Sequence, residues 1–312
     1  MTFSTKQLAE EVGGLLVGDA TTQCLGGAID SRLCERGNVF FALKGEHSDG
    51  HNFIDAAIEA GCSAVVVERK VQSTVPVVKV DDVRKSLFAL AMSRRAGFGS
   101  TKVIAITGSV GKTTTKDMIA SMLGKEAVAS RKSFNNDLGV PLTILAGEGA
   151  EYLVAEVGAN DVGEIEPLAQ LVQPDISVLT SIDSAHLEGF GDKETVLAEK
   201  VKLLEVLPSN GIAILPEGID LSPFDVKATI YRVGRSENAD VQIKTGMNAL
   251  GYATLQIGED VVTLSLLGEH NAWNAAFAIV ACMLGNPTLL KKDLMNMVSS
   301  IMPPTGRLQV NT

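Results

Sequence analysis

The stretch Ile104-Ala105-Ile106-Thr107-Gly108-Ser109-Val110-Gly111-Lys112-Thr113-Thr114 decides the fold of this chain. An apolar run that enters a glycine turn and continues as a helical pattern predicts a buried strand, a phosphate-binding loop and a helix. Glycines let backbone N–H groups face phosphate oxygens, Lys112 can reach the outer phosphates, and Thr113 can bind magnesium. We therefore expect a nucleotide to bind at Thr107, Gly108, Ser109, Val110, Gly111, Lys112, Thr113 and Thr114.

Apolar strands and helices alternate on the C-terminal side of residue 102, which predicts a mostly parallel, doubly wound α/β sheet. The expected strands are 103–107, 152–157, 176–182 and 211–215, and the expected helices are 112–123, 163–172 and 194–206. Further strands are expected at 226–233 and 241–244, followed by a hairpin of 253–257 and 261–266 and a last helix near Asn271. We expect this ATPase-like domain to span residues 101–312.

The N-terminal part of the chain has the pattern of a smaller α/β domain. Ser4-Thr5-Lys6-Gln7 reads as a capping box at the start of a helix. Strands are expected at 39–43, 64–68 and 75–80, with a helix at 52–60. These elements place a first domain at residues 1–82, and a helix at 83–96 with a glycine-rich stretch to residue 100 forms the expected connection.

Composition limits the kind of protein that this chain can be. With 312 residues, 46% hydrophobic and 21% charged, it has the composition of a globular protein of two domains. Its 27 basic and 37 acidic side chains give a net charge of −10, which argues against binding to nucleic acid. The apolar run at 275–284 is shorter than the ~18 to 20 residues of a membrane span. Four cysteines without metal-ligand spacing favour free thiols in the cytoplasm.

Three polar groups follow or face the ends of the expected strands, where α/β sheets bind ligands. Glu156 follows one strand and could hold magnesium, although a solvated loop acid is the alternative. His186 follows another strand, and a lone loop histidine is often simply exposed. Lys200 lies on the next helix, where a lysine is ordinarily a surface residue.

Two loops of the first domain combine cationic, hydroxyl and glycine residues. They are Asp30-Ser31-Arg32 and Lys44-Gly45-Glu46-His47-Ser48-Asp49-Gly50-His51. Such loops could bind a second phosphorylated ligand, because Arg and Lys supply charge while Ser and Gly allow close approach. Ordinary turn-forming loops have the same composition, so both readings stay open.

Together these motifs resemble the Mur ligase family, the ATP-dependent amide ligases of peptidoglycan precursor synthesis. The family's phosphate loop lacks the first glycine of the general motif, and Ile106 stands at that position here. The resemblance extends from Asp30 to Arg307. It is greatest to the member that adds D-alanyl-D-alanine to UDP-N-acetylmuramoyl-tripeptide, through Phe134-Asn135-Asn136-Asp137-Leu138-Gly139-Val140-Pro141-Leu142-Thr143, Glu156-Val157-Gly158-Ala159-Asn160 with Gly163-Glu164-Ile165, and Ala185-His186-Leu187-Glu188-Gly189-Phe190-Gly191.

The resemblance implies roles for individual residues. Lys112 and Thr113 would handle the ATP phosphates and one magnesium ion, and Glu156 and His186 would help to hold magnesium. Lys200 matches a lysine that reacts with carbon dioxide, and its carbamate would bind metal as an anion. The ATP side would also include Asn271, Asn274 and Arg307. The UDP-sugar would face Ser31, Arg32, Lys44, Gly45, Asp49, His51, Asn135 and Asn136. Val157 and Lys202 depart from this member's pattern, which has methionine and an acidic residue there.

The implied reaction is ATP-dependent and passes through an acyl phosphate, with magnesium as cofactor and the UDP-linked tripeptide and D-alanyl-D-alanine as substrates. We expect a cytoplasmic, monomeric enzyme of cell-wall synthesis, and hence of cell shape and division. Gly306-Arg307-Leu308 resembles the hinge before the family's third domain, so a chain ending at Thr312 is expected to be inactive alone. The alternatives are a Mur ligase that adds a single amino acid and a nucleotide-binding module without ligase activity.

Overall fold

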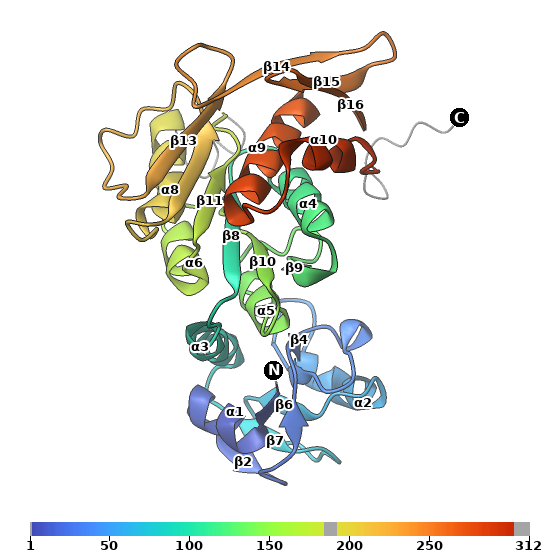
Figure 1. Cartoon of the computed structure of the whole chain (residues 1–312). Helices are drawn as coiled ribbons and strands as arrows, with labels where there is room; N and C mark the ends of the chain where they lie inside the picture. The colour runs from blue at the N-terminus through green and yellow to red at the C-terminus, as the bar shows by residue number, and fades with distance from the viewer. Residues whose placement is uncertain (1, 184–191, 303–312) are drawn as a thin grey trace. The chain divides into compact units, whose positions relative to one another are not determined.

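The computed structural model describes residues 2–183 and 192–302, which divide into two compact units (Figure 1). The first unit comprises the residues up to Ser100 together with Asp137–Gly149. The second comprises Thr101–Asn136 and the described residues from Ala150 onward. The chain therefore passes between the units three times.

The first unit is built on a five-stranded sheet with the order β2-β7-β6-β5-β4, in which only β2 runs antiparallel to its neighbour. A separate antiparallel pair is formed by β1 and β3. The strands are β1 (Phe3–Ser4), β2 (Leu15–Val17), β3 (Gln23–Cys24), β4 (Gly27–Ala28), β5 (Val39–Phe41), β6 (Ala64–Val67) and β7 (Val77–Lys79). The helices are α1 (Thr5–Val12), α2 (Ile54–Glu59), α3 (Val83–Ala96) and α5 (Gly139–Ala146), with 3-10 turns η1 (Ser31–Leu33) and η2 (Gly50–Phe53).

The capping box predicted at the start of α1 is confirmed. The backbone N–H of Gln7 donates to Ser4 Oγ at 3.2 Å, and the N–H of Ser4 donates to Gln7 Oε1 at 2.8 Å. Each bond satisfies a backbone donor that the helix end would otherwise leave unpaired. Gly13 ends the helix in the left-handed conformation, with φ of 63°.

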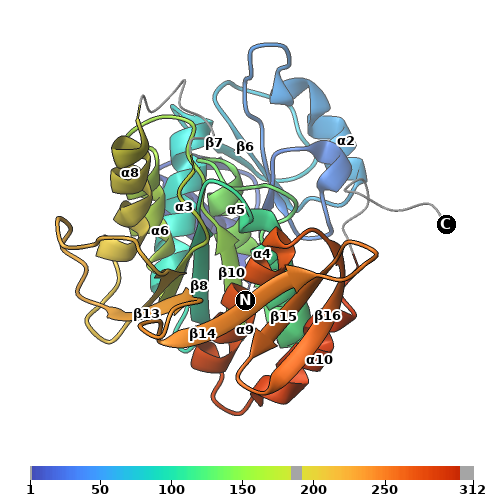
Figure 2. The same ribbon diagram turned by 90° about the horizontal axis from the view of Figure 1, so that it is seen from above.

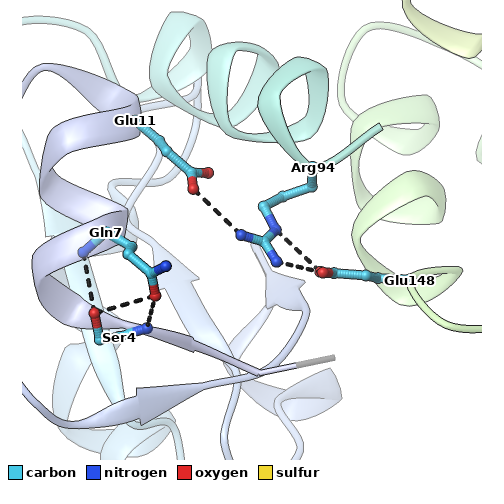
Figure 3. Close-up of polar contacts among 5 residues, drawn as sticks. All are labelled: Ser4, Gln7, Glu11, Arg94 and Glu148. Atoms are coloured by element: carbon cyan, nitrogen blue, oxygen red, sulfur yellow. Dashed lines mark hydrogen bonds and ion pairs between the residues drawn. The ribbon is translucent and has the colours of Figure 1, made fainter. Parts of the chain in front are cut away.

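A largely buried ionic cluster ties three segments of the first unit together (Figure 3). The guanidinium of Arg94 on α3 lies between Glu11 of α1, at 3.2 Å, and Glu148, which follows α5. Only 15% of the Arg94 side chain and 6% of the Glu148 side chain are exposed. The guanidinium also lies 4.9 Å from the centre of the Phe3 ring. The cluster therefore fixes the inserted segment 137–149 to both helices.

The second unit is built on a nine-stranded sheet with the order β16-β15-β14-β13-β12-β11-β8-β10-β9. The strands from β9 to β14 pair in parallel, and β15 and β16 add an antiparallel hairpin at one edge, as Figure 2 shows. The strands are β8 (Lys102–Thr107), β9 (Ala127–Ala129), β10 (Tyr152–Glu156), β11 (Ile176–Leu179), β12 (Ile212–Pro216), β13 (Thr229–Gly234), β14 (Val241–Met247), β15 (Tyr252–Ile257) and β16 (Asp260–Leu267).

Helices cover both faces of this sheet (Figure 1). They are α4 (Lys112–Leu123), α6 (Ile165–Val172), α8 (Lys193–Glu205), α9 (His270–Gly285) and α10 (Lys291–Ser299), with a 3-10 turn η3 (Gly124–Glu126) after α4. The helices α4, α9 and α10 pack together on one face, and α6 packs with α8 on the other. The predicted doubly wound, mostly parallel sheet is therefore confirmed. Among the described helices, none combines the length and the apolar composition that a membrane span would need.

The division into units differs from the predicted boundaries in two respects. The helix α3, predicted as a connection, belongs to the first unit, and so does the segment 137–149 from within the predicted second domain. The physical reason is the helix α5, whose residues from Gly139 to Leu145 are all buried. A helix that is apolar all round must be covered on every side, and α3 and β4 of the first unit pack against it.

Candidate nucleotide and metal site

The predicted phosphate loop joins the end of β8 to the start of α4. Its glycines are required by geometry: Gly108 and Gly111 have φ of 148° and 89°. A Cβ atom at Gly111 would lie 2.3 Å from Oδ1 of Asn274. No side chain among the described residues caps the N-terminus of α4, so the first turn presents its N–H groups as a site for an anion.

The segment after β11 holds this loop in place. The N–H of Ser109 donates to the carbonyl of Ser181 at 2.9 Å, and the N–H of Val110 donates to Ser181 Oγ at 3.0 Å. The hydroxyl of Thr180 donates to the carbonyl of Val110 at 2.6 Å. The parallel pairing of β8 with β11 brings these residues together, so contacts within the protein determine the shape of the loop.

The Lys112 side chain folds back over the loop, where its ammonium donates to the carbonyl of Gly108 at 2.6 Å and contacts that of Ser109 at 3.3 Å. Burial lowers the pKa of Lys112, and the negative charge of Glu156 partly opposes that shift. A cation that sits on two carbonyl groups can exchange them for phosphate oxygens, which are stronger partners for an ammonium.

Glu156 ends β10 beside β8 and is only 1% exposed, so the alternative of a solvated loop acid is wrong. Its Oε1 accepts a hydrogen bond from Asn135 Nδ2 at 2.9 Å. Its Oε2 is buried and has no hydrogen-bond partner among the described residues. A buried carboxylate oxygen without a partner is costly, and a divalent cation would satisfy it. The donor set therefore fits magnesium.

Lys200 lies on α8 and is 4% exposed, so the alternative of a plain surface lysine is wrong. Burial, followed by the charge of Lys112, lowers the pKa of Lys200 to about 8, while Glu199 acts in the opposite direction. Lys202, two residues later, has 39% of its side chain exposed and pairs with Glu205 at 2.9 Å. The helix thus turns one lysine inward and leaves its neighbour at the surface.

Glu199 is a site residue that the sequence reasoning missed. Its carboxylate accepts hydrogen bonds from the N–H groups of Gly163, at 2.9 Å, and Ile165, at 2.7 Å. It thereby holds the loop between Glu156 and α6 against the helix that carries Lys200. No local pattern identifies such a contact, because the partners are more than thirty residues apart.

The two asparagines predicted on the ATP side lie at the start of α9 and are buried. Asn274 Nδ2 donates to Asn271 Oδ1 at 3.1 Å, and Asn271 Nδ2 donates to the carbonyl of Leu267 at 2.8 Å. The close approach of Asn274 to Gly111 brings this helix end to the phosphate loop. His186 and Arg307, also predicted at this site, lie outside the described residues. In the part of the chain that is described, no three His, Cys, Asp or Glu side chains group as metal ligands.

In the first unit, Ser31 is buried at the 3-10 turn η1 and Arg32 next to it is exposed. The Arg32 guanidinium is held by two hydrogen bonds to Asp30, at 2.9 and 2.6 Å, and this pairing lowers the pKa of Asp30. Lys44 forms a β-bridge with Asp49, and the N–H of Gly45 donates to Ser48 at 2.8 Å. The predicted loops are therefore ordered turns that expose cationic groups.

His51 and Asp49 take part in holding these turns. The Nδ1 atom of His51 contacts Asp49 Oδ1 at 2.7 Å, and its Nε2 accepts from the N–H of Glu68 at 3.2 Å. Arg69 donates to Asp49 Oδ2 at 2.7 Å, and hydrogen bonds from His51 and Arg69 hold the pKa of Asp49 well below its usual range. The structure gives both residues a supporting part, and their contact with a sugar nucleotide stays a prediction.

Asn135 and Asn136, which were predicted to face the UDP-sugar, belong to the second unit, and their contact with that ligand stays a prediction. The structure places the Asn135 amide on Glu156, and the N–H of Gly158 donates to the Asn135 carbonyl at 2.8 Å. Asn135 is thus a partner of the candidate metal ligand, a relation that the sequence did not indicate.

Comparison with known proteins gives matches along most of the chain. The family described as "Mur ligase middle domain" matches residues 106–282, and "Mur ligase family, catalytic domain" matches residues 26–95. The UDP-N-acetylmuramoyl-tripeptide–D-alanyl-D-alanine ligase of Bacillus subtilis is 35% identical over 288 residues, which cover 89% of this chain and 63% of that protein. The chain therefore spans less than two thirds of the length of this curated relative.

The chain is also similar to solved structures of MurF over most of its length. A crystal structure of MurF from Acinetobacter baumannii superposes with a TM-score of 0.84 at 32% identity, covering 99% of this chain and 70% of that one. MurF ligase from Thermotoga maritima, in complex with ADP, superposes with a TM-score of 0.73 at 29% identity, covering 91% and 67%.

Proposed function

The chain belongs to the Mur ligase family, and we propose that it acts in the ATP-dependent addition of D-alanyl-D-alanine to UDP-N-acetylmuramoyl-tripeptide, a step of peptidoglycan precursor synthesis. The proposal depends on one observation. The phosphate loop follows β8, and the neighbouring strand β10 ends at Glu156, a buried carboxylate with one oxygen that has no hydrogen-bond partner among the described residues. The names of the relatives, which are UDP-N-acetylmuramoyl-tripeptide–D-alanyl-D-alanine ligases, support the choice of substrates.

The proposed chemistry has two steps. A carboxylate oxygen of the tripeptide attacks the γ-phosphorus of ATP, which gives an acyl phosphate and ADP. The amine of D-alanyl-D-alanine then attacks the acyl carbon, so that the amide forms and inorganic phosphate leaves with a proton lost from the amine. Lys112 and the N–H groups at the start of α4 would stabilise negative charge on the transferred phosphoryl group.

Magnesium, when bound, would neutralise charge on the phosphate oxygens. Glu156 and Thr113 are the described residues that would hold it, and His186 would join them by family resemblance. Oε2 of Glu156 supports this assignment because it is buried without a hydrogen-bond partner among the described residues.

Lys200 would complete the site as a carbamate. Its neutral amine would attack carbon dioxide, and loss of a proton would leave an anion. The pKa of about 8 supports this, because a far larger share of the amine is neutral near pH 7 than in a lysine with the ordinary value of 10.5. The negative product would also remove the unfavourable pairing of the Lys200 and Lys112 charges.

The turns that carry Ser31, Arg32, Lys44 and Gly45 would bind the UDP-sugar, with Arg32 supplying charge. Burial raises the pKa of the Cys24, Cys62 and Cys282 thiols to about 12 and keeps them unreactive. Four free cysteines support a reducing, cytoplasmic location. The monomeric state stays a prediction for size-exclusion chromatography.

A substrate panel tests the proposal. The complete gene product is supplied with ATP, magnesium and UDP-N-acetylmuramoyl-tripeptide, and phosphate release is followed with D-alanyl-D-alanine or with single amino acids. We expect release and a ligated product only with the dipeptide. A preference for one amino acid would indicate another Mur ligase activity, and no ligation with any amine would indicate a nucleotide-binding module.

Glu156→Gln should affect the binding of ATP and of the UDP-linked tripeptide differently. Magnesium-dependent ATP binding should weaken at least ~10-fold, because a carboxylate that holds the metal is lost. Affinity for the UDP-linked tripeptide, measured by calorimetry, should stay within about twofold, since its predicted binding turns belong to the other unit. Equal loss of both affinities would indicate a folding defect and count against this assignment.

A further inference from the structure

Lys116 is a buried charged residue that the proposed chemistry does not use. It lies on α4, one turn after Lys112, and is 1% exposed. Its ammonium donates to the carbonyls of Ser130 and Lys132, both at 2.8 Å, and contacts Asp117 at 2.9 Å. Burying an ammonium is costly unless such partners compensate. An apolar side chain at this position could not donate hydrogen bonds to the two carbonyls.

The carbonyls that Lys116 binds belong to residues 130–136, which follow β9 and which we call the 130–136 segment. Lys132 within it has φ of 50°, a left-handed conformation that is unfavourable for a residue with a side chain. The two bonds from Lys116 span this turn. They therefore hold the segment in a conformation that its own backbone disfavours.

The same segment contacts Glu156 near both of its ends. The Ser130 hydroxyl accepts from the N–H of Glu156 at 3.0 Å, and Asn135 Nδ2 donates to Glu156 Oε1 at 2.9 Å. The N–H of Gly158 donates to the Asn135 carbonyl at 2.8 Å. A continuous set of hydrogen bonds thus runs from the helix that begins at the phosphate loop to the candidate metal ligand.

We propose that Lys116 is a positioning residue for magnesium binding: by holding the 130–136 segment, it lets Asn135 fix one carboxylate oxygen of Glu156 and direct the other toward the metal. The inference rests on the proposed role of Glu156 as a magnesium ligand. Hydrogen-bond partners of a metal ligand restrict its orientation, and removing one typically costs metal affinity roughly 10- to 100-fold.

A purely structural lysine would behave differently. Its loss would lower the stability of the second unit and weaken the binding of every nucleotide to a similar extent. The positioning role instead predicts a selective effect on the metal, because the phosphate loop is held by hydrogen bonds to Thr180 and Ser181, which lie outside the 130–136 segment.

The test is Lys116→Met, a substitution of similar length without the charge. The magnesium concentration that half-saturates ATP binding should rise about tenfold. ADP affinity in the presence of a chelator should change less than about twofold. The matched control is Lys291→Met, which removes another lysine bound to a backbone carbonyl, that of Ile257 at 3.0 Å, and to an acid, Asp260 at 2.8 Å. The control should leave the magnesium dependence unchanged.

Asn135→Ala provides a second route if Lys116→Met does not fold. It leaves Lys116 intact and should produce the same rise in the magnesium requirement. Where the double variant can be made, its effect should be no larger than that of Asn135→Ala alone, because both changes act through one contact. Additive effects, or an unchanged magnesium requirement in both single variants, would overturn the inference.

Hydrogen exchange gives a readout without metal. In the ligand-free protein, Lys116→Met should speed exchange at the N–H groups of Glu156 and Gly158, which bond to the 130–136 segment, while Lys291→Met should not. Unchanged exchange there would also overturn the inference. Glu156→Gln separates this outcome from failure of the proposed function: if that variant keeps its magnesium dependence, the role of Glu156 itself is wrong.

Discussion

Replacing Lys200 by methionine should stabilise the folded chain near neutral pH, although it removes a residue proposed to act in catalysis. The reason is that folding buries the Lys200 ammonium beside the charge of Lys112 and lowers its pKa from 10.5 to about 8. The gap of about 2.5 between these values, at about 1.4 kcal/mol for each pKa unit, corresponds to about 3 kcal/mol of lost stability at pH 7.

The pH dependence has a definite sign. Below pH 8 the amine is charged in the folded and the unfolded chain, so the full cost of burial is present. As the pH rises through 8, the folded chain releases its proton first and the cost declines, and above 10.5 it vanishes because both states are neutral. The advantage of Lys200→Met should therefore fall from about 3 kcal/mol at pH 7 to about 1.4 kcal/mol at pH 9.5.

Urea unfolding in buffer freed of carbon dioxide measures this difference. Lys202→Met is the matched control, because its exposed ammonium pairs with Glu205 and this pairing raises its pKa; it should be neutral or destabilise by less than ~1 kcal/mol. Added bicarbonate should stabilise the parent chain and leave Lys200→Met unchanged. A variant no more stable than the parent at pH 7, or a difference that does not shrink at pH 9.5, would refute the reasoning.

Two further substitutions test other parts of the structure. Arg94→Met should destabilise the first unit by roughly 3 to 5 kcal/mol in urea unfolding, because it leaves buried carboxylates without their cation. The control Lys6→Ala breaks an ion pair whose lysine is 69% exposed, and it should cost under ~1 kcal/mol. Equal costs would contradict the stabilising role of the Arg94 cluster shown in Figure 3. Gly111→Ala should weaken ATP binding at least ~10-fold, since its Cβ would meet Asn274 at 2.3 Å. Gly163→Ala, at φ of 91° with nothing within 4 Å, is the control that introduces backbone strain alone, and a similar loss in both would refute the steric argument.

Much of this protein could be predicted from local sequence. The predicted bounds of α3 and α4 agree with the structure, as do the capping box at Ser4 and the hairpin of β15 and β16. Each depends on residues a few positions apart: a capping side chain, a helical period or a turn between two strands. The phosphate loop is equally local, since strand, glycines, lysine and helix follow one another directly.

Other elements had no local signal. The helix α5 reads as a short apolar run without helical period, because all of its faces are buried. Its place in the first unit depends on α3, more than forty residues earlier in the chain.

The sequence alone therefore determined the class of fold, the phosphate loop and the identity of the chemical groups at the site. Only the tertiary structure decided which of those groups are buried and which meet. Lys200 and Lys202 are two residues apart on one helix, yet Lys200 is buried and has a lowered pKa, while Lys202 is only partly buried and has a raised pKa. The hydrogen bond from Asn135 to Glu156 joins residues 21 positions apart, and the one from Lys116 to the carbonyl of Ser130 joins residues 14 positions apart. Burial and such contacts depend on how distant segments pack, which no local pattern encodes.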